Sequence, residues 1–218
     1  MGLSKYLPLI VGGIDEAGRG PVIGSMIIAG ITIGEKQIES LKLLGVKDSK
    51  LLSPKKRETL YDSLIKFPHQ VFKISPTKID AMVKVKRLNY LEAVYFAKTI
   101  DSLSNPKKPF WFYVDCPDVN TERFRDLVMS LQKKSPRHSV KAEHHADTNY
   151  TVVGAASILA KVTRDREIEK LKHRLEVNFG SGYPSDPLTI AFLRGLLKQG
   201  APLPPYVRKS WKTCQRLS

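Results

Sequence analysis

The sequence contains only two cysteines, Cys116 and Cys214, and they do not have the spacing of a metal-binding pair. No further Cys or His stands at ligand spacing from His144 and His145, so the sequence argues against a zinc site. We expect supporting or surface roles for both histidines. A reducing cell interior would keep the cysteines as thiols. Disulfides do occur inside hyperthermophiles, so a bond between the two remains the alternative.

The sequence also lacks any apolar run that approaches the roughly 20 residues needed to span a bilayer. Its first residues, MGLSKYLPLIVGGIDE, have no usable signal peptide, so we expect a cytoplasmic protein without membrane association. There is no internal repeat and no low-complexity tract. Hydrophobic residues make up 42% of the 218 positions, which is enough for the core of one domain, or of one domain with a small appendage.

Acidic residues are scarce relative to basic ones. The chain has 21 Asp and Glu against 36 Lys and Arg, a formal net charge of +15. Such an excess favours a polyanionic partner, either nucleic acid or an anionic membrane surface. Because no membrane segment is expected, an intracellular nucleic-acid partner is the better interpretation.

Runs of β-forming residues predict five strands: one that ends near Asp15, and four over residues 22–33, 71–74, 110–115 and 140–143. The second strand is expected to run antiparallel to the first, across a Gly-Arg-Gly-Pro turn. Capping residues and apolar spacing predict helices over residues 38–44, from Pro54, from Pro76 to about 84, and over 88–103, 120–131, 151–178 and 187–198. The small residues near the start of the 151–178 helix permit close docking on a sheet. This alternation favours an α/β fold.

Carboxylates stand at the ends of several predicted segments. Asp15 and Glu16 end the first strand, Asp115 ends the apolar 110–115 strand, and Asp147 precedes the long helix. Ligands of open α/β sheets gather at strand ends. Neighbouring strand residues face opposite sides, so we expect Asp15 and Glu16 to share one site only because the following glycines break the pleat.

These residue types favour metal binding. Burying two adjacent anions is unfavourable unless a cation neutralises them, and all-oxygen ligands select Mg²⁺ or Mn²⁺ over zinc. The sequence offers no nucleophile with a matched His and Asp, so four carboxylates and a polyanionic substrate suggest two-metal phosphoryl transfer, with ions roughly 4 Å apart. From the residues alone, Asp15 and Glu16 also fit a solvated acidic turn, and Asp147 fits a helix cap.

Candidate substrate contacts surround the carboxylates. The turn at Gly18, Arg19 and Gly20 lets backbone approach a ligand closely and adds a guanidinium suited to phosphate or a sugar hydroxyl, although its glycine spacing does not fit a dinucleotide fingerprint. Each remaining candidate has a structural alternative. Lys47 and Lys50 either hold phosphates or are solvated, Lys161 can simply pair with Asp165, and Tyr183 can be a packed turn residue.

Several motifs together resemble type 2 ribonuclease H, the ribonuclease HII family, in its archaeal-like branch. The resemblance covers nearly the whole chain and rests on GIDEAGRGPVIG at residues 13–24, KDSK at 47–50, YVD at 113–115, AEHHAD at 142–147, AASILAKVTRD at 155–165, GSGYPSD at 180–186 and VRKSWKT at 207–213. It implies a ribonuclease H-like mixed five-stranded sheet flanked by helices, with a small helical C-terminal lobe. We expect a catalytic domain over residues 1–177 and a basic lobe over 178–218 that clamps a polyanion.

The resemblance also implies an activity. Members of this family cleave RNA within RNA–DNA duplexes and 5′ of single ribonucleotides in duplex DNA, leaving 5′-phosphate and 3′-hydroxyl ends. The resemblance assigns Asp15, Glu16 and Asp115 as primary ligands of Mg²⁺ or Mn²⁺, with Asp147 completing the site. It further implies that Gly18, Arg19 and Gly20 sense the ribose 2′-hydroxyl, that Tyr183 stacks on the neighbouring sugar, and that Lys47, Lys50 and Lys161 contact the substrate. A monomer is expected.

Two other functions remain open at this level. A non-catalytic nucleic-acid-binding protein would suit the charge, but it has no use for four acids that repel phosphate. A transposase- or resolvase-like nuclease would cut DNA without ribonucleotides, and the Gly-Arg-Gly turn and Tyr183 argue against it.

Overall fold

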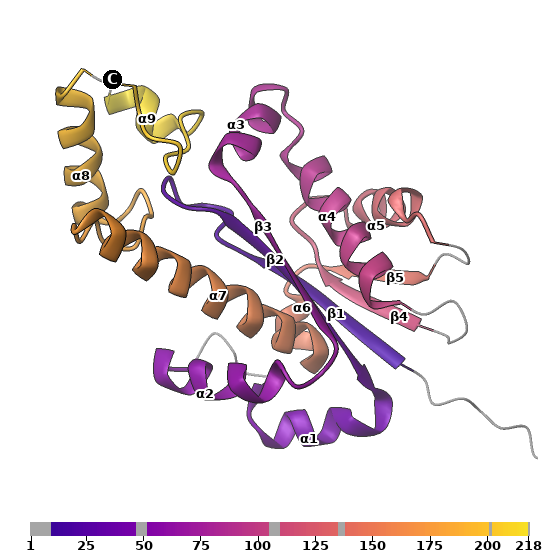
Figure 1. Ribbon diagram of the computed structural model, residues 1–218. Helices are drawn as coiled ribbons and strands as arrows, with labels where there is room; N and C mark the ends of the chain where they lie inside the picture. Colours follow the sequence, from indigo (N-terminus) through magenta and orange to yellow (C-terminus); the bar gives the residue numbers. More distant parts are fainter. Residues whose placement is uncertain (1–9, 47–51, 105–109, 135–137, 201, 218) are drawn as a thin grey trace, which may run out of the picture.

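The computed structural model describes residues 10–46, 52–104, 110–134, 138–200 and 202–217. Within them, five strands form one mixed sheet in the order β3-β2-β1-β4-β5 (Figure 1). β1 pairs antiparallel with β2 and parallel with β4, while β3 and β5 complete the two edges. The predicted mixed five-stranded sheet is therefore confirmed. The strands are β1 (Ile10–Ala17), β2 (Met26–Gly34), β3 (His69–Ile74), β4 (Phe110–Asp115) and β5 (Ser139–Glu143).

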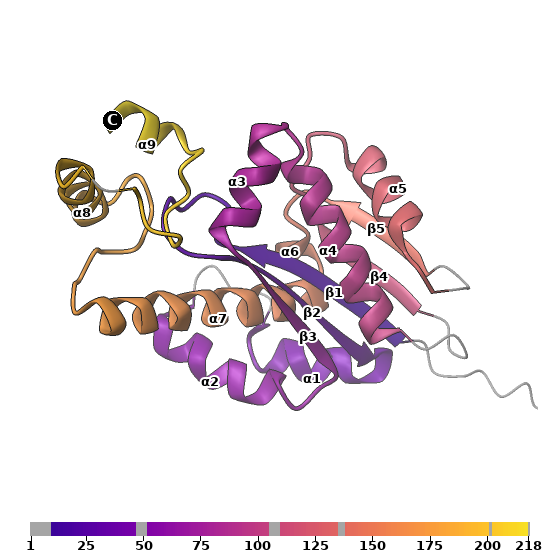
Figure 2. The same cartoon turned by 45° about the horizontal axis from the view of Figure 1, so that its top comes forward.

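Helices cover both faces of this sheet (Figure 2). One layer contains α1, α2 and α7, and the other contains α3, α4 and α5, each closing its own apolar cluster against the strands. None of the described helices combines the length and apolarity needed to cross a membrane. The helical elements are η1 (Glu35–Gln37), α1 (Ile38–Leu43), α2 (Pro54–Leu64), α3 (Pro76–Lys84), α4 (Leu88–Leu103), α5 (Thr121–Leu131), α6 (Ala146–Asn149), α7 (Thr151–Leu175), α8 (Pro187–Lys198) and α9 (Lys212–Leu217).

α7 packs directly on the backbone of β1. A Cβ atom at Gly13 would lie 2.2 Å from the carbonyl oxygen of Val152, so no larger residue fits between strand and helix. The first turns of α7 carry Gly154, Ala155 and Ala156, all buried, as the pattern of small residues predicted. This close contact brings the start of α7 to the sheet edge where β1 and β4 end.

The first two strands differ from their predicted bounds. β1 continues past Asp15 to Ala17 because its backbone keeps pairing with β2 to the last residue. The second strand begins only at Met26, whereas the sequence predicted it from residue 22. Gly24, at a φ of +94°, breaks the extended backbone, and the two N–H groups before it donate to the carbonyl of Gly182 instead.

Helix starts are better predicted than helix ends. Ser53 caps α2 as expected, since its hydroxyl oxygen accepts a hydrogen bond of 3.3 Å from the N–H of Lys56. The long helix α7 ends at Leu175 rather than Asn178, because Glu176 adopts a left-handed φ of +54°.

The segment before α7 corrects the prediction for Asp147. His145, at a φ of +58°, redirects the chain into the separate short helix α6, which contains Asp147. Tyr150 is the N-cap residue of α7 and makes no side-chain capping bond. The alternative in which Asp147 caps the long helix is therefore wrong.

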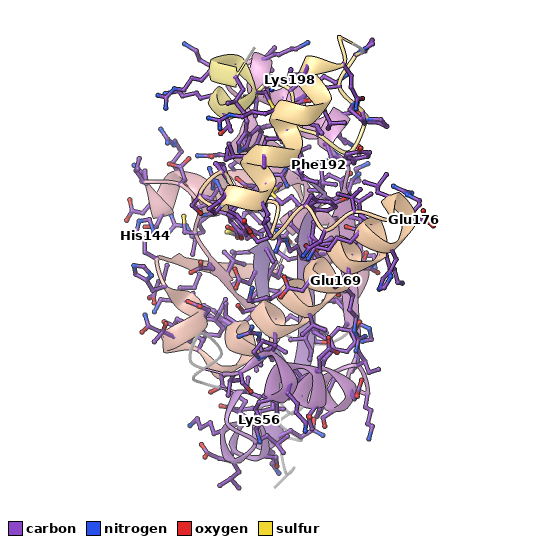
Figure 3. All side chains as sticks on the ribbon, turned by 90° about the vertical axis from the view of Figure 1, so that its left-hand side faces the viewer. Lys56, His144, Glu169, Glu176, Phe192 and Lys198 are labelled. Atoms are coloured by element: carbon purple, nitrogen blue, oxygen red, sulfur yellow. The ribbon has the colours of Figure 1, made fainter. Side chains whose placement is uncertain are left out.

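The C-terminal residues form a small helical lobe on the far end of α7. Figure 3 shows α8, with Phe192 and Lys198, beside the end of α7, where Glu169 lies in the helix and Glu176 follows its last residue. An apolar cluster joins this lobe to the rest of the chain, and it includes Ile23, Ile168, Phe179, Leu193 and Val207. The cluster spans the predicted boundary at residues 177 and 178, which stays a prediction. Helix α9 lies in a part of this lobe for which the sequence predicted no helix.

Candidate active site

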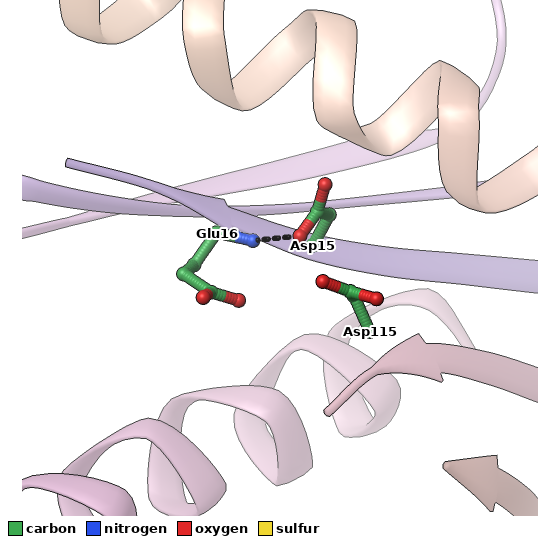
Figure 4. Close-up of side chains that lie close together, drawn as sticks. All are labelled: Asp15, Glu16 and Asp115. Carbon is green, nitrogen blue, oxygen red and sulfur yellow. Dashed lines mark hydrogen bonds between the residues drawn. The ribbon is translucent and has the colours of Figure 1, made fainter. Parts of the chain in front are cut away.

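Three carboxylates converge at the edge where β1 and β4 end. Asp15, Glu16 and Asp115 each offer an oxygen, and these three atoms lie within 4.8 Å of one another. Figure 4 shows the three side chains turned toward a common point. Asp15 is buried, whereas Glu16 and Asp115 are half-buried. Asp15 and Asp115, one hundred positions apart in the sequence, therefore lie together, as their places at strand ends predicted.

The strands bring the carboxylates together without a broken pleat. Pairing between β1 and β4 stops at the Ile14–Val114 pair, while β1 stays paired with β2 through Ala17. The sheet thus opens on one side of β1 only, and Glu16 reaches the opening from within a regular strand. The expectation that the downstream glycines break the pleat is wrong, because the gap comes from the end of β4.

Backbone groups fix the orientation of the two aspartates. The N–H of Ala146 donates to Oδ1 of Asp115 over 2.7 Å, and the N–H of Glu16 donates to Oδ1 of Asp15 over 2.7 Å. The Ser157 side chain, on α7, also hydrogen-bonds Asp15 and thereby lowers its pKa. Each aspartate therefore has a held oxygen and faces the cluster in a fixed orientation.

The cluster is electrostatically unfavourable by itself. Burial raises the pKa of Asp15 well above its usual value, and the charges of Glu16 and Asp115 raise it further. Burial also raises the pKa of Glu16 to about 8, with Glu92 and Asp115 adding to the effect and Arg19 opposing it. Such mutual repulsion favours the binding of a positive charge among the three oxygens.

The donor set fits a hard divalent cation. Oε2 of Glu16 is buried and has no hydrogen-bond partner among the described residues. The three converging groups offer only carboxylate oxygens, which Mg²⁺ and Mn²⁺ prefer and zinc does not. His144 and His145 are exposed and lie outside the group, in keeping with the surface role expected of them.

Asp147 lies next to the cluster but not in it. It is buried in α6, one residue after Ala146, whose N–H holds Asp115. The group of oxygens within mutual 4.8 Å reach contains Asp15, Glu16 and Asp115 and does not include Asp147. The structure thus brings together three of the four predicted ligands and leaves the fourth in the adjoining helix α6.

The Gly-Arg-Gly turn is held from behind by the C-terminal segment. Arg208 is fully buried, and its guanidinium donates to the carbonyl oxygens of Gly18, Arg19 and Gly24 over 2.6, 2.8 and 3.0 Å. The indole N–H of Trp211 donates to the carbonyl of Gly20 over 2.9 Å. Gly18 has a φ of +80°, which favours glycine at this position. The turn is therefore a fixed element rather than a loose loop.

The contacts with Arg208 also fix the direction of the backbone N–H groups of the turn, because a trans peptide places its C=O and N–H on opposite sides. The carbonyls of Gly18 and Arg19 point toward Arg208, so the N–H groups of Arg19 and Gly20 point away from it. Neither N–H donates to another residue in the described part of the chain. Gly20 is exposed, so its backbone donor is open to a ligand.

The Arg19 side chain lies against α4 and the end of β4. Its Nη2 donates to Oδ1 of Asn89 over 2.8 Å, and its Nη1 donates to the carbonyl of Pro117 over 3.1 Å. The same Nη1 lies 3.1 Å from Oε2 of Glu92, which is fully buried. Burial raises the pKa of Glu92 to about 7, and the nearby Arg19 charge opposes this effect. Asn89 is itself held by Asp118, over 2.8 Å.

The structure brings Tyr183 to the same turn. A Cβ at Gly20 would lie 3.5 Å from the Tyr183 ring, and the Arg164 guanidinium lies over that ring at 4.9 Å from its centroid. Lys161 pairs with Asp165 over 3.4 Å, and both side chains stay about two-fifths exposed. Lys47 and Lys50 lie outside the described residues.

A cavity of about 340 Å³ opens just beyond the turn, beside Gly24. Its walls are rich in basic side chains and include Lys73, Arg164, Lys170 and Arg174. Such a lining is in keeping with the polyanionic partner that the net charge predicted.

Sequence reasoning missed four residues that hold the turn: Asn89, Glu92, Arg208 and Trp211. Glu92 had a signal, because it is the single acid among the apolar residues at the start of its helix, where a charge needs a partner. Arg208 and Trp211 lie in the motif quoted for the family resemblance, but their segment was interpreted only as a basic polyanion clamp. Cys116 and Cys214 are both buried in the structure, and no disulfide joins them.

The chain is similar to known proteins over nearly its whole length. The family model described as ribonuclease HII matches residues 12–214. The ribonuclease HII of Thermococcus sibiricus is 49% identical over 209 residues, which are 95% of this chain and 90% of that protein. The crystal structure of ribonuclease H2 from Pyrococcus horikoshii matches with a TM-score of 0.86 at 47% identity, over 95% of this chain and 96% of that one. Bst-RNase HIII in complex with Mn²⁺, at 19% identity, shares the fold with a TM-score of 0.82 over 98% of this chain and 70% of that one.

Proposed function

Because the chain belongs to the ribonuclease HII family and is a metal-dependent ribonuclease H endonuclease, we propose that it cleaves the RNA strand of RNA–DNA hybrids and also cuts duplex DNA 5′ of single embedded ribonucleotides. The products are 5′-phosphate and 3′-hydroxyl ends. One observation carries this proposal: three carboxylates within 4.8 Å of one another lie beside a rigid Gly-Arg-Gly turn. A site that only binds nucleic acid gains nothing from clustered anions, since they repel phosphate.

The residues that would hold divalent metal are Asp15, Glu16 and Asp115, with Asp147 completing the site. Bound Mg²⁺ or Mn²⁺ would supply the activation of water and the charge stabilisation that two-metal phosphodiester hydrolysis requires. The chain itself supplies orientation: the N–H of Ala146 fixes Asp115, and the backbone of Glu16 together with Ser157 fixes Asp15. Carboxylates held in this way need little rearrangement when substrate binds.

The turn is suited to selecting a ribonucleotide. The outward N–H groups of Arg19 and Gly20 are donors without a partner among the described residues, and a ribose 2′-hydroxyl is an acceptor that DNA lacks. Tyr183 lies against Gly20, where its ring can stack on the neighbouring sugar. Lys161, and with it Lys47 and Lys50, would contact the phosphate backbone.

The decisive experiment uses two duplexes, one with a single ribonucleotide in DNA and one of DNA alone, each incubated with the full chain and Mg²⁺ or Mn²⁺. We expect cleavage only at the 5′ side of the ribonucleotide. Equal cutting of both duplexes would favour a transposase- or resolvase-like nuclease. Binding of both duplexes by folded protein without cleavage would instead favour a non-catalytic binding protein.

Replacing Tyr183 by alanine is expected to lower the preference for the ribonucleotide junction about tenfold, because base or sugar stacking on an aromatic side chain contributes roughly 1–3 kcal/mol. Tyr183→Phe, which keeps the ring, should stay within about threefold of the unmodified chain. The measurement is the ratio of single-turnover rates on the single-ribonucleotide duplex and on an RNA–DNA hybrid. An unchanged ratio in Tyr183→Ala would contradict the stacking role.

We also propose that the enzyme acts as a monomer in the cytoplasm. The three converging carboxylates and the turn beside them all come from one chain, so no second copy is needed to complete the site. Sedimentation of the full chain at micromolar concentration would measure its oligomeric state.

A further inference from the structure

Glu92 is an unusual residue for its surroundings. It lies in α4 and is fully buried, and neither of its oxygens has a hydrogen-bond partner among the described residues. Its contact with a positive charge is the 3.1 Å approach of Arg19 Nη1. A buried ion pair contributes little to stability, since desolvation offsets the attraction, and an apolar residue would serve the core of the helix at least as well. The presence of a carboxylate here points to a role in the site.

Arg19 has two possible sets of partners. It is anchored by Glu92, Asn89 and the carbonyl of Pro117, and it is still one-third exposed. It also lies close enough to Glu16 for its charge to influence that carboxylate. A guanidinium forms strong bidentate pairs with carboxylates. If the anchors on α4 were lost, the guanidinium would be free to turn toward the Glu16 carboxylate, whose pKa its charge already lowers.

The anchoring is reinforced from behind. Asn89 donates to Asp118 over 2.8 Å, and Asp118 in turn accepts from the N–H of Asn120 over 3.0 Å and pairs with Arg123. Asn89 therefore presents its carbonyl oxygen, and not its amide nitrogen, to Arg19. Glu92 supplies the negative charge that this neutral partner lacks.

We propose that Glu92 is a positioning residue that holds the Arg19 guanidinium on α4, keeping it off the cation-binding carboxylates and in place to contact substrate. This inference rests on the proposed function for the meaning of the cation site. Its consequence is specific: Glu92 affects cation binding through Arg19, and loses this effect when Arg19 is absent.

The test is a double-mutant cycle of Mn²⁺ affinity, measured by calorimetry on the full chain without nucleic acid. Glu92→Gln keeps the shape of the side chain and removes its charge. We expect it to weaken Mn²⁺ binding at least about tenfold, as for other residues that support metal ligands. In an Arg19→Gln background, the same Glu92→Gln change should alter the affinity by less than about twofold. Removing Arg19 should thus rescue the Glu92→Gln chain.

A direct charge effect predicts a different result. If Glu92 only adds negative potential, Glu92→Gln weakens Mn²⁺ binding equally in both backgrounds, and the proposal is overturned. Unchanged Mn²⁺ affinity in Glu92→Gln overturns it as well. The matched control is Glu58→Gln on α2, whose exposed carboxylate pairs with Arg166, and it should leave Mn²⁺ affinity unchanged.

A second variant guards against loss of folding. Glu92→Met replaces the buried charge by an apolar chain of similar volume, which is often neutral or stabilising at such positions. It should fold and show the same Arg19-dependent loss of Mn²⁺ affinity. A folded Glu92→Met chain with full affinity would show a merely structural role. Because this readout involves no cleavage, it is independent of whether the chain selects ribonucleotides, so failure of the proposed substrate is distinguishable from failure of this inference.

Discussion

Replacing Asp115 by asparagine is expected to slow cleavage of a single-ribonucleotide duplex by about a thousandfold or more, with little loss of duplex binding. The asparagine side chain keeps an oxygen that can accept the hydrogen bond from the N–H of Ala146, so the local fold should persist. It removes one of the three carboxylates proposed as cation ligands. Bound metal ions supply several kcal/mol of transition-state stabilisation, and each 1.4 kcal/mol equals a factor of ten. Asp15→Asn should behave alike.

Single-turnover rates and fluorescence anisotropy on the same duplex separate chemistry from binding. Binding should stay equal or become tighter, since a charge that repels phosphate has been removed. Asp126→Asn is the matched control, because this aspartate on α5 is two-thirds exposed and pairs with the adjacent Arg125. Turnover close to that of the unmodified chain would remove Asp115 from the cation site.

Replacing Arg208 by alanine is expected to cost about 3 kcal/mol or more of the free energy of unfolding and to abolish most of the junction preference. The change removes three hydrogen bonds from a fully buried guanidinium and leaves the carbonyls of Gly18, Arg19 and Gly24 without their donor. Hydrogen bonds to a charged donor contribute roughly 1.5–3 kcal/mol each, and water that enters the space left by the side chain restores part of this loss. Arg208→Lys retains the charge but cannot donate to all three carbonyls from one planar group. Its stability and junction preference should therefore lie between those of Arg208→Ala and the unmodified chain.

Chemical denaturation measures the first effect, and the ratio of cleavage rates on the junction duplex and on the hybrid measures the second. Arg216→Ala, an exposed arginine in the same segment, should change the free energy of unfolding by no more than about 0.5 kcal/mol. If Arg208→Ala were as stable as Arg216→Ala, the turn would not depend on the C-terminal segment.

Local patterns were sufficient for most of the fold. Apolar runs that end on Asp15 and Asp115 predicted two strand ends at one edge, and the observed parallel pairing of β1 with β4 places both carboxylates there. The order of the strands came from the family resemblance, because periodicity does not specify which strands are neighbours. The strand bounds failed where tertiary contacts override local preference, as at Gly24 and Ala17.

The contacts that hold the Gly-Arg-Gly turn and Arg19 in place could not be predicted from local patterns. The sequence indicated only that Arg208 lies in a basic lobe expected to clamp a polyanion. In the structure its guanidinium instead donates to backbone carbonyls. The sequence shows Glu92 as an isolated acid among apolar residues, but it does not show which residue pairs with it. Its role depends on a contact with Arg19, which lies seventy-three positions earlier, and no local sequence pattern predicts such a contact.

The bonds from Arg208 and Trp211 to residues 18–24 have a consequence for biosynthesis. The ribosome synthesises residues 18–24 long before residues 208–211, so these contacts form only after the intervening chain has been made. A chain clipped before residue 208 retains every carboxylate of the cluster but lacks the Arg208 and Trp211 side chains that hold the Gly-Arg-Gly turn. If the turn selects ribonucleotides as proposed, that selectivity depends on contacts that form after the carboxylates of the cluster have been synthesised.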